Sequence, residues 1–147
     1  MKLKIAWIGK TKDPAIRSLT VEYLKRISRF ADVQGLPLSD EAALLKLCEK
    51  SGTRPAHALV LLDPRGKQLS SEEFAKFLQD HEDRNPMPLV LAIGPADGFS
   101  DAARSAARMT ISLGRMTLAH ELALIVLLEQ AYRAFTILNG HPYHTGH

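Results

Sequence analysis

The chain has 147 residues, of which 46% are hydrophobic and 24% charged, and its formal net charge is +3. This length suits a single globular domain, so we expect residues 1–147 to form one domain. No stretch approaches the roughly 20 apolar residues of a membrane span, and the first residues lack a signal-peptide core, so we expect a cytoplasmic protein. The single cysteine, Cys48, excludes an intrachain disulfide, and its apolar helical neighbours favour a buried thiol over a nucleophile.

Charge is distributed unevenly along the sequence. Residues 1–29 carry eight basic and two acidic side chains (+6), whereas residues 30–103 carry seven basic and twelve acidic ones (−5). Residues 104–147 carry four arginines and two glutamates (+2). Basic ends around an acidic middle are typical of contact with phosphates, although a solvated basic helix face explains the same pattern without a ligand.

Taken in chain order, the first elements alternate between strand and helix. Residues 4–9 predict a strand, and Asp13 followed by Pro14 is typical of a helix N-terminus. Apolar residues spaced three and four apart predict a helix after this cap. Residues 32–38 and 40–50 then predict a short strand and a second helix.

The second half continues the alternation. Residues 57–63 and 89–94 are continuous apolar runs, which suit strands buried on both faces of a parallel sheet. Ser70 and Glu73 have the spacing of a helix capping box. The remaining expected elements are a short helix at 100–108, a strand at 109–113 and a long helix at 117–139, followed by Gly140.

This order predicts an α/β fold with one parallel sheet and helices on both faces. Ligands of such sheets bind beyond the carboxyl ends of the strands, so the candidate loops are 63–67, 94–98 and 114–117. Their glycines would let backbone approach a flat ligand, although glycines after strands also simply make tight turns. Neither G-x-G-x-x-G nor G-x-x-x-x-G-K-[ST] occurs, which argues against dinucleotide and nucleoside triphosphate sites.

The last helix and the tail have unusual compositions. Residues 122–128 are apolar on every side, which predicts complete burial and, for a terminal helix, a homodimer interface. Glu129 and Arg133 have the spacing of an ion pair, with a substrate clamp as the alternative role for Arg133. The ending NGHPYHTGH holds titratable and aromatic rings that a disordered tail would lack, so we expect it to dock.

The segment SLGRMTLAHELALIVLLEQAYRAFTILNGHPYH, residues 112–144, resembles the bacterial 23S ribosomal RNA pseudouridine N3 methyltransferases of the SPOUT, or α/β-knot, superfamily. Gly94-x-x-x-Gly98, Leu62-Asp63-x-x-Gly66-Lys67 and the total length match as well. The resemblance covers nearly the whole chain, and EQAYRA and NGHPYH are its most specific parts.

The resemblance implies a single-domain SPOUT fold with a C-terminal trefoil knot that holds S-adenosylmethionine. It further implies a homodimer in which the tail of one subunit approaches the cofactor of the other, and no metal. The substrate would be a pseudouridine in helix 69 of 23S rRNA, within the assembled ribosome. Carried over by position, the cofactor residues are Leu62, Gly94, Gly98, Leu113, Gly114, Arg115, Met116, Thr117 and Leu118.

The tail supplies the catalytic candidates. The N3 imide of pseudouridine attacks a methyl group well only as its proton leaves, so a group that titrates near neutral pH is needed. His141 and His144 are candidates for this role, with His120 as an alternative, and Tyr143 could stack on or hydrogen-bond the base. Arg133 completes the candidate catalytic set.

Four positions depart from the family pattern: Pro95-Ala96 where Gly-Pro is usual, Ala119 for proline, Leu124 for arginine, and a tail without its usual basic residue. Fewer positive charges would weaken contact with RNA. Three alternatives stay open: a SPOUT methyltransferase of another RNA base, a non-catalytic RNA- or ribosome-binding module, and a flavodoxin-like nucleotide or phosphate binder.

Overall fold

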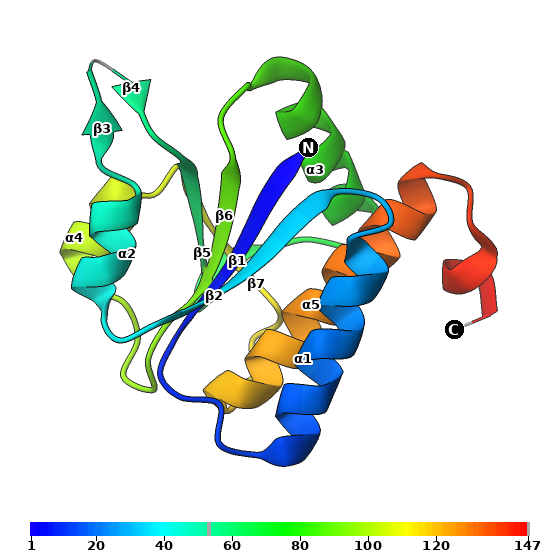
Figure 1. The fold of residues 1–147 in the computed structure, drawn as a ribbon, viewed down its shortest axis with the longest axis horizontal. Helices are drawn as coiled ribbons and strands as arrows, with labels where there is room; N and C mark the ends of the chain where they lie inside the picture. The colour runs from blue at the N-terminus through cyan, green and yellow to red at the C-terminus, as the bar shows by residue number, and fades with distance from the viewer. Residues whose placement is uncertain (53, 147) are drawn as a thin grey trace.

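A five-stranded parallel sheet forms the centre of the molecule (Figure 1). The computed structural model describes residues 1–52 and 54–146; His147, the last of the tail histidines, lies outside the described residues. The strand order is β2-β1-β6-β5-β7, and each neighbouring pair is parallel. The strands are β1 (Lys2–Ile8), β2 (Asp32–Leu38), β5 (Ala58–Gln68), β6 (Leu89–Ile93) and β7 (Met109–Ser112). The predicted parallel α/β sheet is confirmed.

Helices cover both faces of this sheet. Figure 1 shows α1, α3 and α5 on one side of the strands and the shorter α2 and α4 on the other. The helices are α1 (Pro14–Ile27), α2 (Glu41–Leu47), α3 (Ser71–Arg84), α4 (Asp101–Ala106), α5 (His120–Leu138) and the 3₁₀ helix η1 (Pro142–Gly146). Among the described residues, no helix is both long and apolar enough to cross a bilayer.

The core consists of two layers that the strands separate. Alternate residues of β1 show the division: Leu3 and Ile5 belong to the cluster beneath α1, α3 and α5, whereas Ala6 and Ile8 belong to the cluster beneath α2 and α4. All five residues of β6 are buried. Continuous apolar runs therefore correspond to strands covered on both faces, as the sequence predicts.

Side-chain caps fix two helix starts as predicted. The carboxylate of Asp13 accepts a hydrogen bond from the Ala15 N–H, with Pro14 in the first turn of α1. At α3, the Ser70 hydroxyl accepts from the Glu73 N–H and the Glu73 carboxylate accepts from the Ser70 N–H, which completes the capping box.

Several boundaries differ from the predictions. β5 extends to Gln68 through what we expected to be a loop, because its pairing with β7 shifts register between Leu62 and Lys67. The long helix starts at His120 rather than residue 117, because the backbone of Ala119 is not helical (φ −55°, ψ 141°). A two-strand hairpin, β3 (Lys50–Ser51) with β4 (Arg54–Pro55), follows α2, which ends at Leu47 rather than residue 50.

The apolar segment of α5 is only partly covered. Leu124, Leu127 and Leu128 are buried in the core, but 53% of the Leu122 surface is exposed. The expectation of burial on every side is therefore not met within one chain. Leu124 is 1% exposed, so at this departure from the family pattern the side chain faces the core and not the surface.

Gly66 lies against the backbone of β7. A Cβ at this position would stand 2.7 Å from the carbonyl carbon of Ile111 and 2.8 Å from the Thr110 carbonyl group, so only glycine fits without a shift of the strand. The bulge of β5 and strand β7 are thus in close contact, next to the candidate loops. The trefoil knot itself stays a prediction.

Candidate functional site

The bulge within β5 and the loops that follow β6 and β7 surround one cavity at the carboxyl edge of the sheet. Its volume is about 600 Å³, within the range of roughly 300–1,000 Å³ typical of small-molecule sites. The start of α5 closes one side through His120 and Ala123. Parallel topology thus brings together segments that lie far apart in the sequence.

Eight of the nine predicted cofactor residues line this cavity: Leu62, Gly94, Gly98, Leu113, Gly114, Met116, Thr117 and Leu118. Arg115, the ninth, belongs to the same loop but is not among the lining residues. Side chains outside the predicted cofactor set also contribute. Asp63 and Arg65 lie in the expected segment 63–67, whereas Phe99 and Ala123 lie outside the expected loops. Asp63 ends the apolar run of residues 57–63 and could have been found by that signal. The contribution of Phe99 depends on packing that the local sequence does not reveal.

Two loop glycines have backbone conformations that other residues rarely adopt. Gly98 has φ +85° and Gly114 has φ +140°. Gly94 has no positive φ, but a Cβ there would approach the Phe99 ring to 2.8 Å. A left-handed backbone conformation is therefore required at Gly98 and Gly114, whereas Gly94 is constrained by the Phe99 ring.

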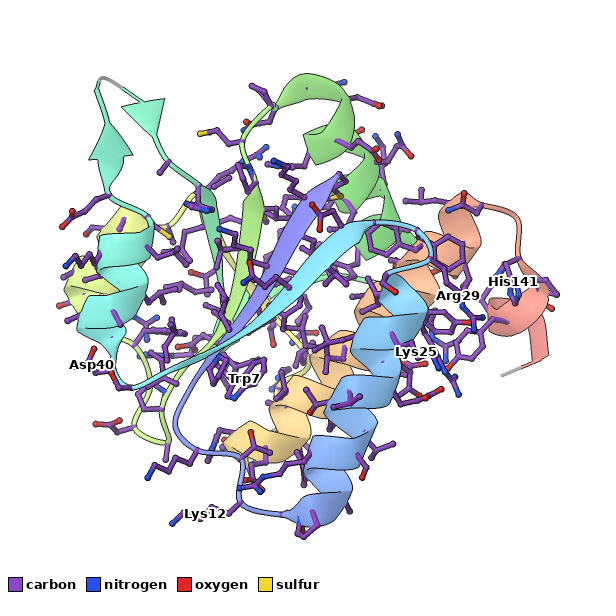
Figure 2. All side chains as sticks on the ribbon, viewed as in Figure 1. Trp7, Lys12, Lys25, Arg29, Asp40 and His141 are labelled. Carbon is purple, nitrogen blue, oxygen red and sulfur yellow. The ribbon has the colours of Figure 1, made fainter. Side chains whose placement is uncertain are left out.

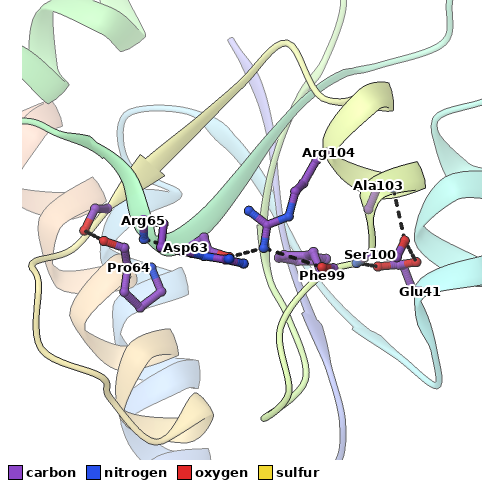
Figure 3. A network of polar contacts seen from close by, with 9 residues as sticks. Glu41, Asp63, Pro64, Arg65, Phe99, Ser100, Ala103 and Arg104 are labelled. Atoms are coloured by element: carbon purple, nitrogen blue, oxygen red, sulfur yellow. Dashed lines mark hydrogen bonds and ion pairs between the residues drawn. The ribbon is translucent and has the colours of Figure 1, made fainter.

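Asp63 connects the bulge of β5 to α4 (Figure 3). Its carboxylate accepts a 2.8 Å hydrogen bond from the Arg65 N–H and a 2.8 Å bond from Nη2 of Arg104. The Arg104 guanidinium also lies 3.5 Å from the Phe99 carbonyl oxygen. Burial raises the pKa of Asp63, but the Arg65 N–H and the Arg104 charge outweigh burial, so the pKa lies below its ordinary value.

Further hydrogen bonds hold segments next to the cavity. The Glu41 carboxylate accepts from the N–H and the hydroxyl of Ser100, which ties α2 to the start of α4 (Figure 3). The buried Ser112 hydroxyl donates to the Gly114 carbonyl at 2.7 Å and accepts from the Gly114 N–H at 3.0 Å. These two hydrogen bonds close a turn at the start of the loop after β7.

His120 lines the cavity and carries an unsatisfied polar atom. Its Nε2 is buried and has no hydrogen-bond partner among the described residues. A Cβ on Gly9 would lie 3.3 Å from this nitrogen, so the residue that follows β1 approaches the start of α5 closely. A buried nitrogen without a partner is suited to a ligand hydrogen bond.

The predicted catalytic residues gather elsewhere, at the far end of α5. The ring of Tyr143 in η1 packs edge-on against Tyr132, with ring centroids 4.7 Å apart. The Tyr143 hydroxyl donates to Oε1 of Glu129 at 3.1 Å, and the Arg133 guanidinium lies 5.3 Å from the Tyr143 ring centroid. Arg133 also donates to Glu129, as the sequence predicts. The tail is docked, as we expected.

The titratable groups of the tail are constrained by this docking. Burial, with hydrogen bonding to Tyr23 and the charge of Glu129, raises the pKa of Tyr143. Nδ1 of His141 accepts a hydrogen bond from the Tyr143 N–H at 3.1 Å. Nδ1 of His144 is buried and has no partner among residues 1–52 and 54–146.

The two groups of candidates are far apart within one chain. His120 lines the cavity at the start of α5, and Arg133 lies thirteen residues further along the same helix. At 1.5 Å per residue this separation is roughly 20 Å. The structure thus unites most of the cofactor candidates with each other, and the tail candidates with each other, but not one group with the other.

Comparison with known proteins identifies the family. A family model described as "Predicted SPOUT methyltransferase" matches residues 1–144. The chain belongs to the SPOUT methyltransferase family. A relative from Koribacter versatilis, named ribosomal RNA large subunit methyltransferase H, is 55% identical over 147 residues that cover both chains completely. One from Geotalea daltonii with the same name is 47% identical and covers 98% of this chain and 99% of its own.

Solved structures agree with the SPOUT fold. A probable methylase family protein from Haemophilus influenzae aligns with a TM-score of 0.61 at 8% identity, covering 96% of this chain and 69% of its own. The SpoU methyltransferase AviRb from Streptomyces viridochromogenes, in complex with AdoMet, aligns with a TM-score of 0.53 at 16% identity, covering 90% and 57% of the two chains.

S-adenosylmethionine is the methyl donor of SPOUT methyltransferases, and the cavity of this chain fits such a ligand. The lining offers apolar surface from Leu62, Leu113 and Leu118 for the adenosine part. The carboxylate of Asp63 and the guanidinium of Arg65 offer both signs of charge, as a ligand with a sulfonium, an ammonium and a carboxylate requires. Among the described residues, no group of three or more His, Cys, Asp or Glu side chains could hold a metal ion.

Proposed function

We propose that this protein methylates large-subunit ribosomal RNA, at N3 of a pseudouridine in helix 69 of 23S rRNA in the assembled cytoplasmic ribosome. The curated relatives, which match over their full length, support the RNA class. The resemblance of residues 112–144 supports the base and the helix. The fit of the cavity to S-adenosylmethionine supports the same reaction.

The observation that carries the mechanism is the separation of the cavity from the tail along α5. A homodimer in which the tail of one copy reaches the cavity of the other would bring the two groups together. Exposed apolar side chains near the cavity and on α1 support such an interface: Leu19, Val21, Met116, Leu118 and Leu122. The active site would then be composite, with each chain supplying one half.

In this proposal, bound S-adenosylmethionine supplies an electrophilic methyl group. The glycine loops and Leu62, Leu113 and Leu118 position the donor and exclude water. A tail histidine, His141 or His144, accepts the N3 proton of the base, because imidazole titrates near neutral pH. His120 is the alternative acceptor, since the residue lines the cavity and its Nε2 has no partner among the described residues.

The contacts of Tyr143 suggest a role that differs from stacking on the base. Its ring is engaged by Tyr132 and Arg133, and its hydroxyl is engaged by Glu129. We therefore assign Tyr143 and Arg133 to positioning of the tail rather than to direct contact with the base. Glu129, which the sequence pointed to only as an ion-pair partner, becomes the anchor of this arrangement.

The deciding experiment combines ligand binding with methyl transfer. Calorimetry should show that wild type binds S-adenosylmethionine, and purified ribosomes from a strain without this protein should be methylated. Mass spectrometry of the digested rRNA should then find the methyl group on pseudouridine. A methyl group on another nucleoside would refute the assigned base, and binding without transfer would favour a non-catalytic module.

Composite catalysis can be tested with two defective variants. His144→Ala should bind S-adenosylmethionine without transferring methyl, and Gly114→Val should lose binding because its loop needs a positive φ. Mixed dimers of the two variants keep one intact site and should recover part of the activity. Recovery would fail if each chain worked alone.

A further inference from the structure

A basic surface lies at the end of α1, beside the docked tail. Lys25 and Arg26 lie in the last turn of this helix, and Arg29 follows it. Figure 2 shows Lys25, Arg29 and His141 toward the same end of the molecule. The Arg26 guanidinium lies 5.6 Å from the ring centroid of Tyr132, the residue on which Tyr143 packs.

The cations of this surface differ in whether they have hydrogen-bond or ion-pair partners. Arg26 donates to the Glu22 carboxylate at 2.9 Å and covers the Tyr23 ring at 5.2 Å. Lys25 and Arg29 are exposed, and their side chains form no hydrogen bond or ion pair among residues 1–52 and 54–146. Two cationic groups are therefore available to an external anion.

The surface and the tail form one packed unit. Arg26, Tyr132, Tyr143 and Arg133 are linked by successive ring and cation contacts, and the Phe30 ring packs against Tyr132 at 6.2 Å. An anion bound at Lys25 and Arg29 would thus be held at a fixed position relative to the tail histidines. Cations at the C-terminal end of a helix are also stabilised by the helix dipole, but that effect does not require a position next to the tail.

We propose that Lys25 and Arg29 contact backbone phosphates of the ribosomal RNA next to the target nucleotide; this inference rests on the proposed function. RNA carries one phosphate per nucleotide, so a strand that presents a base to the tail also brings phosphates close to it. These contacts are independent of sequence and set the position of the RNA relative to the tail. Arg26 holds the surface to the tail rather than contacting RNA itself.

Salt dependence of RNA binding tests this role. Ribosomes purified from a strain without this protein would be titrated with wild type and with the double variant Lys25→Gln/Arg29→Gln over a series of potassium chloride concentrations. Loss of two phosphate contacts should reduce the slope of log K against log salt by about 1.4 to 2. Both side chains are exposed, so S-adenosylmethionine binding and the melting temperature should be retained.

A matched control removes the same charge from elsewhere. Lys46→Gln/Lys76→Gln neutralises one exposed lysine on α2 and one on α3, away from the tail, and should leave the slope within about 0.5 of wild type. Glu22→Gln removes the anion of the basic surface and should strengthen RNA binding. Binding of wild type and of each variant to phosphatidylserine vesicles is measured in parallel, as a second anionic surface.

The outcomes separate this inference from the proposed function. An unchanged slope in the Lys25/Arg29 variant, an equal loss in the control variant, or a loss confined to the vesicles would overturn the phosphate contact, while methylation by wild type would leave the proposed function intact. A reduced slope in a protein that methylates no ribosomal RNA would instead support the RNA surface and refute the proposed reaction.

Discussion

Tyr143 and Glu129 connect the tail to the long helix: the Tyr143 hydroxyl donates to Oε1 of Glu129 at 3.1 Å, across fourteen residues of sequence. The same oxygen accepts from Arg133, whose guanidinium lies over the Tyr143 ring. One carboxylate therefore organises both the ring and the hydroxyl of the tail tyrosine. Its charge is what makes these hydrogen bonds strong.

Glu129→Gln should weaken methyl transfer without weakening cofactor binding. Loss of the charge frees Arg133 and loosens the tail, while the cavity lies at the opposite end of α5. We expect at least a tenfold fall in kcat, on the order of 1.4 kcal/mol, and an unchanged dissociation constant for S-adenosylmethionine. Asp80→Asn, which breaks the comparable i,i+4 pair with Lys76, is the control and should alter neither quantity. A normal kcat in Glu129→Gln would contradict the positioning role.

Gly66→Ala should destabilise the protein and impair cofactor binding together. The added Cβ would overlap the β7 backbone, and overpacking of this kind costs about 1–3 kcal/mol. The shift would pass to the 63–66 bulge, which lines the cavity through Asp63, Pro64 and Arg65. Gly140→Ala provides the comparison, because it strains only the end of α5 at φ +68°. Thermal unfolding and calorimetry should show both losses in the first variant and only a stability loss in the second.

Asp63 should make stability depend on acid pH. Its pKa in the folded chain is lower than the ordinary value of 3.8, so the stabilisation is complete above that value and is lost as pH falls through the folded pKa. Urea unfolding would be measured from neutral pH down to about pH 3. The free energy of unfolding should fall less toward acid pH in Asp63→Asn than in wild type. Parallel pH curves for the two proteins would refute this assignment.

Cys48 should react slowly with thiol reagents in the native state. Burial, partly opposed by the charge of Lys4, raises its pKa from 9.0 to about 11. Near pH 8 the thiolate fraction should be about a hundredfold lower than for an unperturbed thiol. Iodoacetamide labelling followed by mass spectrometry should be slow in the folded protein and fast in urea. Rapid native labelling would show that the thiol is activated, against the buried role expected from the sequence.

Much of the fold could be predicted because burial and backbone geometry have local signatures. The apolar runs of β5 and β6, the cap at Asp13 and the capping box at Ser70 were each identified from neighbouring residues alone. The hairpin of β3 and β4 was missed because two-residue strands carry no periodicity. The strand order β2-β1-β6-β5-β7 depends on contacts between distant segments, which periodicity does not encode.

The candidate site was predictable to a similar degree. Loops after parallel strands converge by topology, so residues 94–98 and 114–117 could be named in advance as candidate loops. The nine cofactor residues were carried over from the family resemblance, and eight of them line one cavity. The contribution of Phe99 and Ala123 depends on how α4 and α5 pack, which local sequence does not reveal. The anchoring of Tyr143 by Glu129 was also missed, because the two residues meet only when the chain folds back after Gly140.

The length of α5 determines the distance between the cavity and the tail of each chain in the proposed dimer. The first turn of α5 lines the cavity, and its last turn carries the tail. The number of helical turns between them therefore determines where each tail meets the cavity of the other chain. Substitutions in the tail would change which nucleotide the tail residues contact, while the cavity stays the same. Removal of a single turn from α5 would displace the tail from the cavity of the other chain in both sites of the dimer.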